Sequence, residues 1–217
     1  MNNQTVPHQS PVRPVHIISF DYYVPERILS NCELAQTLDT SDEWIVSHTG
    51  IRERHIATEE QASSDLASIA ARRVLQKSGI SAPEIDLIVL ATASPDYNSF
   101  PATACVVQEK LGCHRAAAFD LTAACTGFVY ALEVAQSMLA ANPKYTHALV
   151  IGAEVFSKIV NWQDRSTCVL FGDGAGAALL RAQPETGGIQ IRDTLLKSDG
   201  SGAEKLWVPE GGSRNSL

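Results

Sequence analysis

The stretch "DLTAACTGFVYALEVAQSMLA", residues 120–140, decides the fold because a strand pattern changes into a helix pattern within it. Cys125 lies at this junction, among the small residues Ala123, Ala124, Thr126 and Gly127. The first N–H groups of a helix have no partners inside the helix and carry a partial positive charge. They favour the nucleophilic thiolate and can hold an oxyanion. The junction therefore makes Cys125 a candidate nucleophile toward thioesters or esters, although a free cysteine more often simply packs in a core.

Apolar runs and helical patterns alternate along the rest of the chain. Runs of strand length are followed by helical patterns, and Gly79 and Pro101 mark a helix end and a helix start. Asn31, Ser64 and the segment "TSDEW" offer helix caps. The expected strands are 16–20, 86–94, 116–122, 147–154, a hairpin over 168–182 and 187–196; the expected helices are 32–39, 65–79, 102–112 and 125–141. We predict an α/β fold with a mixed, mostly parallel five-stranded sheet, one antiparallel edge and helices on both faces.

The composition is that of a globular protein with 45% hydrophobic and 19% charged residues. A net charge of −7 gives no basic surface for nucleic acid. We expect no membrane span, because no apolar run approaches the roughly 20 residues that a bilayer requires. Five cysteines without a CxxC pair argue against a disulfide framework and a zinc site, and favour a cytoplasmic location.

Three motifs carry a resemblance to a known family: "TSDEWIVSHTGIRERHIA" (40–57), "DLTAACTGFVYAL" (120–132) and "FGDGAGAALL" (171–180). From about Val15 onward the chain resembles β-ketoacyl-acyl carrier protein synthase III, a thiolase-like condensing enzyme. The resemblance implies that Cys125 accepts the acyl group of an acyl-CoA primer. Malonyl-acyl carrier protein then loses carbon dioxide, and its carbanion attacks the acyl-enzyme, which starts fatty-acid synthesis. It further implies a homodimer, with CoA and carrier protein as substrates and no metal or redox cofactor.

The resemblance also implies roles for five further residues. Trp44 and Arg165 would flank the CoA adenine, and Thr40 would be a nearby contact. Phe171 would line the acyl pocket, and Phe100 would reach across the dimer interface into the partner's pocket. Taken without the motifs, each of them has a plainer interpretation as a core anchor or a solvated charge.

Pro7, Pro11 and Pro14 indicate a disordered tail over residues 1–14. The resemblance implies that an N-terminal thiolase-like half (15–185) and the start of a connecting region (186–217) follow it. The family's carbanion-stabilising histidine and asparagine lie in a C-terminal half that we expect to be absent. We therefore expect the 217-residue chain to be inactive in condensation. His48 replaces an arginine that family members commonly carry near the CoA phosphates, and "ISFDYYVP" replaces a stretch that usually contains glycine.

The helix predicted over 125–141 is apolar nearly all round, with only Glu133, Gln136 and Ser137 clearly polar. Such a helix needs cover on nearly all sides, and one sheet covers one side. We expect the chain to expose an apolar patch, and to oligomerise, aggregate or pair with another chain.

Three alternatives remain open. A cysteine-dependent thioesterase would use Cys125 and transfer the acyl group to water, but no sequence feature selects the histidine it needs. A non-catalytic partner subunit would copurify with a complete synthase. A dinucleotide-binding loop is the weakest alternative, because Gly172, Gly174 and Gly176 lack the GxGxxG spacing.

Overall fold

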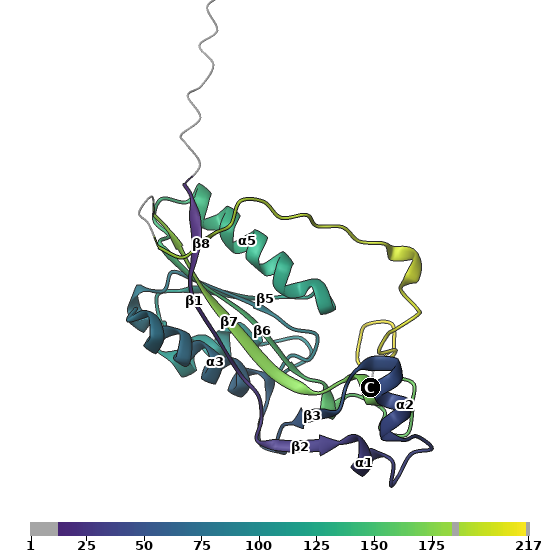
Figure 1. Ribbon diagram of the computed structural model, residues 1–217. Helices are drawn as coiled ribbons and strands as arrows, with labels where there is room; N and C mark the ends of the chain where they lie inside the picture. The colour runs from purple at the N-terminus through teal and green to yellow at the C-terminus, as the bar shows by residue number, and fades with distance from the viewer. Residues whose placement is uncertain (1–12, 184–186, 216–217) are drawn as a thin grey trace, which may run out of the picture.

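The computed structural model of the chain describes residues 13–183 and 187–215. Its centre is a six-stranded sheet in the order β5-β4-β6-β7-β1-β8 (Figure 1). The strands are β1 (Val15–Tyr23), β4 (Leu87–Ala91), β5 (Ala117–Leu121), β6 (His147–Val155), β7 (Asp173–Ala182) and β8 (Ile189–Gln190). The mixed α/β architecture is confirmed, with six strands instead of five because the short β8 pairs with β1. The predicted tail, residues 1–14, lies outside the described residues except for Arg13 and Pro14.

Strand directions separate the sheet into two parts. β4 pairs in parallel with β5 and β6. β7 is antiparallel to both of its neighbours, β6 and β1. The short β8 is antiparallel to β1 and forms the antiparallel edge that was predicted. β7 is a further antiparallel strand inside the sheet, which was not predicted.

The predicted hairpin over 168–182 is wrong. Cys168–Leu170 forms a 3-10 turn, η4, and β7 begins only at Asp173. The Gly-Asp-Gly sequence is typical of a hairpin turn, but here the Asp173 carboxylate accepts hydrogen bonds from Ala57 N (2.7 Å) and Ser157 N (2.8 Å). These tertiary bonds direct the segment away from a local turn.

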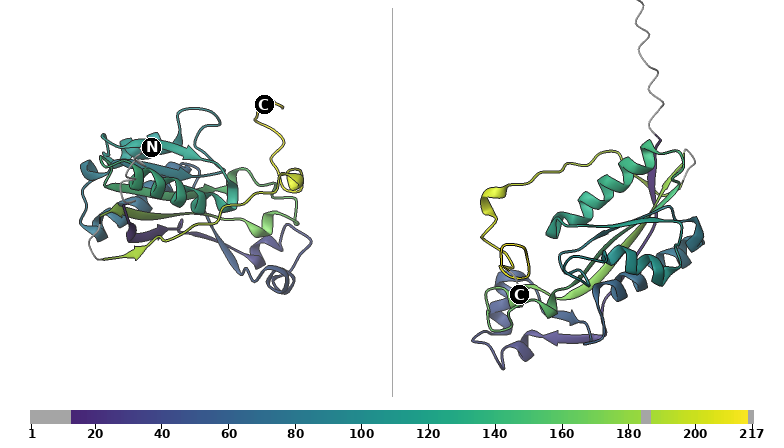
Figure 2. Two further views of the ribbon diagram at one scale, coloured as in Figure 1. Left: turned by 90° about the horizontal axis from the view of Figure 1, so that it is seen from above. Right: turned by 180° about the vertical axis from the view of Figure 1, so that it is seen from behind.

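Helices cover both faces of the sheet, as predicted (Figures 1 and 2). α3 (Ser63–Ser78) and α4 (Thr103–Leu111) pack on one face, and α5 (Gly127–Ala141) packs on the other. α3 starts two residues earlier than predicted, with Ala62 rather than Ser64 at the N-cap, and the Asp65 carboxylate accepts the Ala62 N–H at 2.9 Å. Gly79 ends α3 in the left-handed conformation (φ +72°), as expected.

A smaller unit precedes α3. β2 (Arg27–Ser30) and β3 (Glu53–Ile56) form a two-stranded sheet beside α1 (Asn31–Leu34) and α2 (Asp42–Thr49). Ser41 caps α2, as the segment "TSDEW" predicted. Ser30 rather than Asn31 caps α1, and the helix predicted over 32–39 stops at Leu34. Asn31 is not available for capping because its side chain bonds to Asp42, Ile51 and Arg54.

Short 3-10 turns complete the described secondary structure: η1 (Ala82–Glu84), η2 (Ala124–Thr126), η3 (Phe156–Lys158) and η5 (Gly200–Gly202). After β8 the chain crosses α5 in an extended form (Figures 1 and 2). It is attached there by the Tyr130 hydroxyl on Lys197 O (3.2 Å) and by the Gln136 amide on Ile191 O (3.2 Å).

The outer side of α5 is only partly covered. Its buried residues are Gly127, Ala131, Ala135 and Leu139, whereas the Val129 side chain is 43% exposed. By length and composition alone, the stretch Ala124–Ala141 could cross a membrane, which the search for apolar runs did not predict. Only 22% of this stretch is buried. The exposed apolar side predicted for this helix is thus present.

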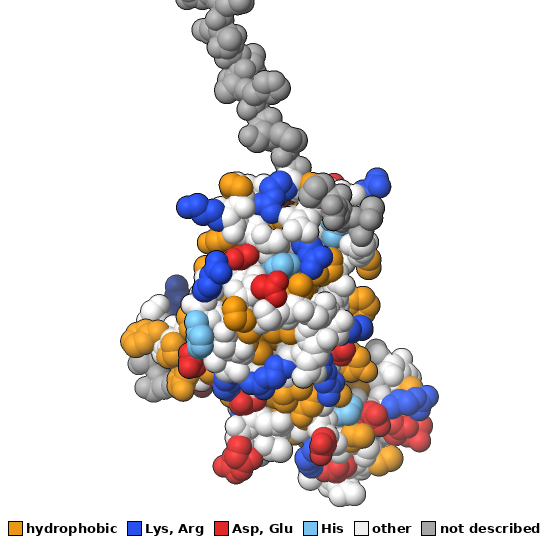
Figure 3. All heavy atoms as spheres, turned by 90° about the vertical axis from the view of Figure 1, so that its left-hand side faces the viewer, with side chains coloured by type: hydrophobic (Ala, Val, Ile, Leu, Met, Phe, Trp, Pro, Cys, Tyr) orange, Lys and Arg blue, Asp and Glu red, His pale blue; other side chains and the backbone are white. Residues whose placement is uncertain are grey.

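The face on the other side of the molecule is different. Figure 3 shows basic and acidic side chains interspersed there, with apolar side chains in separate groups. The charge of −7 is therefore not gathered into one acidic surface on this face.

Candidate active site

Cys125 lies in η2, between the carboxyl end of β5 and the first residue of α5, and it is exposed. The preceding Ala124 has φ +45° and is the one non-glycine residue with positive φ among those the structure describes. Non-glycine residues in this conformation are strained, and such strain is common at functional sites. The thiol is therefore at the tip of the helix and open to the exterior, as predicted.

The N-terminus of α5 is free to receive a ligand group. Within the described part of the chain, no side chain caps its N–H groups. A Cβ atom on Gly127, its first residue, would lie 3.1 Å from Ala91 Cβ at the end of β4. The first turn of α5 therefore packs closely against β4 because position 127 has no side chain, and this contact helps to place Cys125.

A cavity of about 330 Å³ opens beside the thiol. Its walls come from η2, α5 and η3, from the carboxyl ends of β4 and β6, and from the amino end of the antiparallel β7. Phe171 lines it and stacks on Phe156, with ring centroids 5.0 Å apart at 19°. The remaining lining residues are Ala91, Ala124, Cys125, Phe128, Gly152, Ala153, Glu154, Gly174, Ala175 and Gly176. The lining is apolar with one carboxylate, and it contains both Cys125 and the predicted pocket residue Phe171.

Glu154 is the charged residue in this lining, and the sequence analysis did not identify it. It accepts hydrogen bonds from Ala93 N (2.8 Å) and from the hydroxyls of Ser94 (2.5 Å) and Thr92 (3.4 Å). Burial raises the pKa of the Glu154 carboxyl, and these hydrogen bonds oppose the rise. An acidic residue at the end of the buried run "HALVIGAE" was the available signal.

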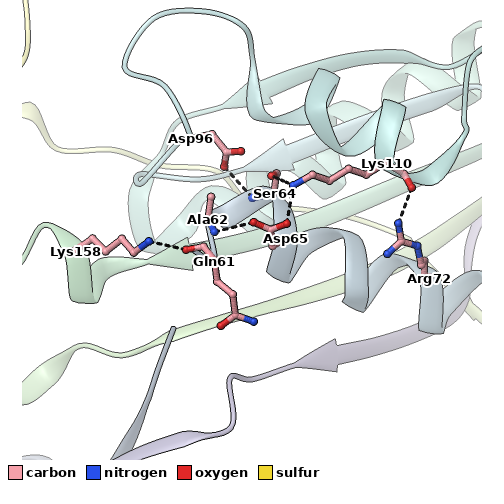
Figure 4. A network of polar contacts seen from close by, with 8 residues as sticks. All are labelled: Gln61, Ala62, Ser64, Asp65, Arg72, Asp96, Lys110 and Lys158. Carbon is pink, nitrogen blue, oxygen red and sulfur yellow. Dashed lines mark hydrogen bonds and ion pairs between the residues drawn. The ribbon is translucent and has the colours of Figure 1, made fainter. Parts of the chain in front are cut away.

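The loop after β4 is also attached to the start of α3. The Ser63 hydroxyl donates to Ser94 O at 2.6 Å, and Ser64 N donates to Asp96 Oδ1 at 2.9 Å. From α4, the Lys110 ammonium reaches the Ser64 hydroxyl (2.6 Å) and Asp65 (2.7 Å), as Figure 4 shows. Burial alone would raise the pKa of the Asp65 carboxyl, but Lys110, the Ala62 N–H and Lys158 together outweigh it and lower the pKa. One side of the site thus rests on a connected polar network.

Trp44 and Arg165, which come from distant parts of the sequence, lie next to each other. The Arg165 guanidinium carbon lies 4.7 Å from the centroid of the Trp44 ring. Arg165 also donates to Asp39 O and lies 3.5 Å from the Asp39 carboxylate. Both residues are separate from the cavity lining around Cys125. α2, which carries Trp44, lies toward the same end of the sheet as the N-terminus of α5 (Figure 1).

His48 lies within α2, the helix that carries Trp44, and Thr40 lies just before it. The His48 ring stacks on Trp44 with centroids 4.3 Å apart, and its Nδ1 lies 2.8 Å from Trp44 O. Thr40 directly precedes the cap residue Ser41, and its buried Oγ1 has no hydrogen-bond partner among the described residues. These observations do not test the roles toward CoA that were predicted for Thr40 and for position 48.

Phe100 lies in the loop between β4 and α4, and its side chain is 84% exposed. The cysteines other than Cys125 fall into two groups. Cys113 and Cys168 are buried, and burial raises the pKa of Cys113 to about 11. Cys32 and Cys105 are exposed, so neither is buried in a core as free cysteines commonly are.

Asp173 is the second carboxylate that sequence reasoning missed. It is 5% exposed, and besides the two backbone N–H groups it accepts the Ser157 hydroxyl at 2.5 Å. It holds β7 to the ends of β3 and β6, next to the loop that carries Phe171. Its position in a Gly-Asp-Gly sequence suggested a turn residue, which concealed this role.

Comparison with solved structures identifies the class. The 3-oxoacyl-(acyl carrier protein) synthase III of Pseudomonas aeruginosa PAO1 superposes with a TM-score of 0.86 at 43% identity, over 94% of this chain and 62% of that one. The corresponding Thermus thermophilus enzyme gives a TM-score of 0.82 at 44% identity, over 88% of this chain and 58% of that one. The fold and the placement of Cys125 define a thiolase-like α/β protein.

Sequence comparison shows which family the chain resembles. The profile described as 3-Oxoacyl-[acyl-carrier-protein (ACP)] synthase III matches residues 119–200. The Beta-ketoacyl-[acyl-carrier-protein] synthase III of Symbiobacterium thermophilum is 53% identical over 203 residues, 94% of this chain and 60% of the relative. That of Xanthomonas oryzae is 52% identical over 189 residues, 87% of this chain and 57% of the relative. The chain is similar to the β-ketoacyl-[acyl-carrier-protein] synthase III family along most of its own length, and it spans about three fifths of the length of these relatives.

Proposed function

We propose that the protein carries out the acyl-accepting part of a decarboxylative condensation that starts fatty-acid synthesis. The observation that carries this proposal is the exposed Cys125 at an uncapped helix N-terminus, beside an apolar cavity. Its substrates are an acyl-CoA and malonyl-acyl carrier protein, and neither a metal nor a redox cofactor takes part. Similarity to the family supports both substrates.

The first step forms an acyl-enzyme. The Cys125 sulfur attacks the thioester carbonyl carbon of acyl-CoA, and the CoA thiolate leaves. Backbone N–H groups at the tip of α5, including that of Cys125, hold the negative oxygen of the tetrahedral intermediate. The acyl chain enters the cavity past Phe171, and the cavity volume of about 330 Å³ suits a short primer.

The second step is a carbon–carbon bond formation. Malonyl-acyl carrier protein loses carbon dioxide, and the resulting carbanion attacks the acyl-Cys125 carbonyl, which releases the thiol of Cys125. No histidine lines the cavity in the part of the chain that the structure describes. We therefore assign the acylation chemistry to the described residues and leave the stabilisation of the carbanion outside them.

CoA recognition involves the aromatic site on α2. An adenine ring would enter between Trp44 and Arg165, which now contact each other, so the guanidinium would have to swing away from the indole. The Thr40 hydroxyl is buried and has no hydrogen-bond partner among the described residues, so it would have to become exposed to contact CoA. His48 already stacks on Trp44 and would support the indole, in place of the phosphate contact of an arginine.

The protein acts as a homodimer in the cytoplasm under this proposal. The exposed Phe100 supports a role in the partner's pocket, because a phenylalanine that is 84% exposed lacks cover within its own chain. Five free cysteines suit a reducing compartment.

Intact-mass spectrometry after exposure to acetyl-CoA tests the acylation step. We expect the wild-type chain to gain the mass of one acetyl group, with the label on the peptide that contains Cys125. Cys125→Ala should lose the label, whereas the matched control Cys105→Ala, also an exposed cysteine, should retain it. Acetylation that persists in Cys125→Ala, or no acetylation of the wild type, would refute the proposal. Steady release of acetate without a condensation product would instead identify a thioesterase.

A further inference from the structure

The segments after β4 and β5 lie beyond the ladders of the sheet, whereas β6 continues to pair with β7 as far as Val155 opposite Asp173. Pairing of β4 with β5 ends at Ala91 opposite Leu121, and pairing of β4 with β6 ends at Ala91 opposite Gly152. Cys125 follows Leu121 by four residues, so no ladder holds the segment that carries the thiol. Contacts after the ladders therefore determine where the sulfur lies.

Glu154 bridges the gap between β6 and the segment after β4. One carboxylate oxygen accepts the N–H of Ala93 at 2.8 Å. The other accepts the hydroxyls of Ser94 at 2.5 Å and Thr92 at 3.4 Å. The Ser94 hydroxyl in turn accepts Val155 N at 2.9 Å, which closes a ring of hydrogen bonds between the two strand ends. One side chain thus holds all three residues that follow β4.

Thr92 extends this connection to the segment that carries the thiol. Its N–H donates to Leu121 O at 3.2 Å, and its carbonyl accepts the Thr122 hydroxyl at 3.3 Å. Thr122 lies three residues before Cys125. The contact between Gly127 and Ala91 adds a second connection, from the end of β4 to the first turn of α5. A displacement of the end of β4 would consequently move Cys125 through Thr122, which precedes it in the chain, and through Gly127, which follows it.

We propose that Glu154 is a positioning residue for Cys125, which fixes the carboxyl end of β4 and through it the turn that carries the thiol. This inference rests on the proposed function only in taking Cys125 as the nucleophile. Glu154 lines the same cavity, but each of its oxygens is occupied by donors from the β4 loop. Its carboxylate therefore holds the protein backbone and is not the base that takes a proton from the thiol.

The rate of alkylation of Cys125 by iodoacetamide tests this role, with Cys32 as an internal reference. Cys32 is exposed in α1 and is not part of the network. Peptide mass spectrometry gives both rates from one sample. Displacement of a reacting group by about 1 Å can cost about a hundredfold in rate, so Glu154→Ala should lower the Cys125/Cys32 ratio by about tenfold to a hundredfold.

Two milder variants keep the test valid if Glu154→Ala fails to fold. Glu154→Gln should rescue most of the ratio, because its amide oxygen still accepts Ala93 N and its NH₂ can donate to the Ser94 hydroxyl. Thr122→Val removes only the link to Thr92 at an exposed position and should lower the ratio by about threefold, the effect of losing one modest hydrogen bond.

Asp86→Ala is the matched control. Asp86 also joins β4 to β6 by accepting backbone N–H groups, but at the other end of the strands. The Cys125/Cys32 alkylation ratio of Asp86→Ala should stay at the wild-type value. The inference is overturned if a folded Glu154→Ala keeps or raises the wild-type ratio, or if Asp86→Ala lowers it equally. A wild type that acetyl-CoA fails to acetylate, together with a lowered ratio in Glu154→Ala, would refute the proposed function and retain this inference.

Discussion

At each end of the central sheet a carboxylate accepts hydrogen bonds from the neighbouring strand segment, but the surroundings of the two carboxylates differ. At the carboxyl ends of β4 and β6, Glu154 accepts backbone and hydroxyl donors and a cavity remains open beside Cys125. At the amino ends of the same strands, Asp86 accepts Thr146 N (2.7 Å) and His147 N (3.1 Å). Nearby, the Arg13 guanidinium donates to the carbonyls of Asn142, Tyr145 and Ala182 and covers that end.

The difference lies in the neighbouring side chains. The carboxyl end is lined by alanines and glycines, which leave space beside the thiol. At the amino end, His147 is 7% exposed, and its Nε2 accepts Arg181 Nε at 3.0 Å while its Nδ1 lies 3.2 Å from Glu84 O. Carboxylate ties stabilise both ends. The cavity at the carboxyl end lies beside the thiol, whereas the cavities at the amino end are lined by Arg181 and by Arg13.

Removal of the Asp173 carboxylate should have the largest effect on stability. Asp173→Ala leaves Ala57 N, Ser157 N and the Ser157 hydroxyl without their acceptor. Because each orphaned buried donor costs about 1–3 kcal/mol, we expect a loss of about 3 kcal/mol in the free energy of unfolding. Urea denaturation measures it. A loss below about 1 kcal/mol would show that water or other groups replace the carboxylate.

Removal of the Asp86 carboxylate should cost less. Asp86→Ala orphans two backbone N–H groups at a partly buried position, so we expect a loss of about 1–2 kcal/mol in the free energy of unfolding. The alkylation rate of Cys125 should not change. Asp173 lies beside the carboxyl ends of β4 and β6, and Asp86 beside their amino ends. If Asp86→Ala destabilised the protein more than Asp173→Ala, the hydrogen bonds at the amino ends would be the stronger of the two sets.

The smallest expected effect is a pH dependence at the amino end. Burial lowers the pKa of His147 below its usual 6.5, so the unfolded chain binds more protons between the two pKa values. The stability contribution of the neutral ring is present above the unfolded pKa and is lost as the pH falls through the folded pKa.

We expect His147→Gln to lose less stability than the wild type when the pH falls from about 7.5 to about 5. Urea midpoints at the two pH values measure the slope, and Arg181, Glu84 and Asp86 are the charged groups near the ring. Equal slopes for the two proteins would contradict the assignment.

The sequence predicted local structure well wherever one residue type dominates. The buried runs "DLIVL" and "HALVIG" could hardly be other than covered strands, and Gly79 and Ser41 mark helix ends through backbone conformation and capping. Prediction failed at Asp173, where a turn sequence serves distant partners, and at Asn31, whose side chain is taken by Arg54 and Asp42. Hydrogen bonds between residues far apart in the chain leave no periodic signal.

By itself, the sequence determined that Cys125 stands where a strand becomes a helix, because periodicity and small residues are properties of neighbours along the chain. Only the tertiary structure decided that β7 lies inside the sheet, that Phe171 joins the cavity and that Glu154 reaches the end of β4. These placements depend on which strands pair and where each ladder stops. Long-range packing sets both, and local propensity does not encode them.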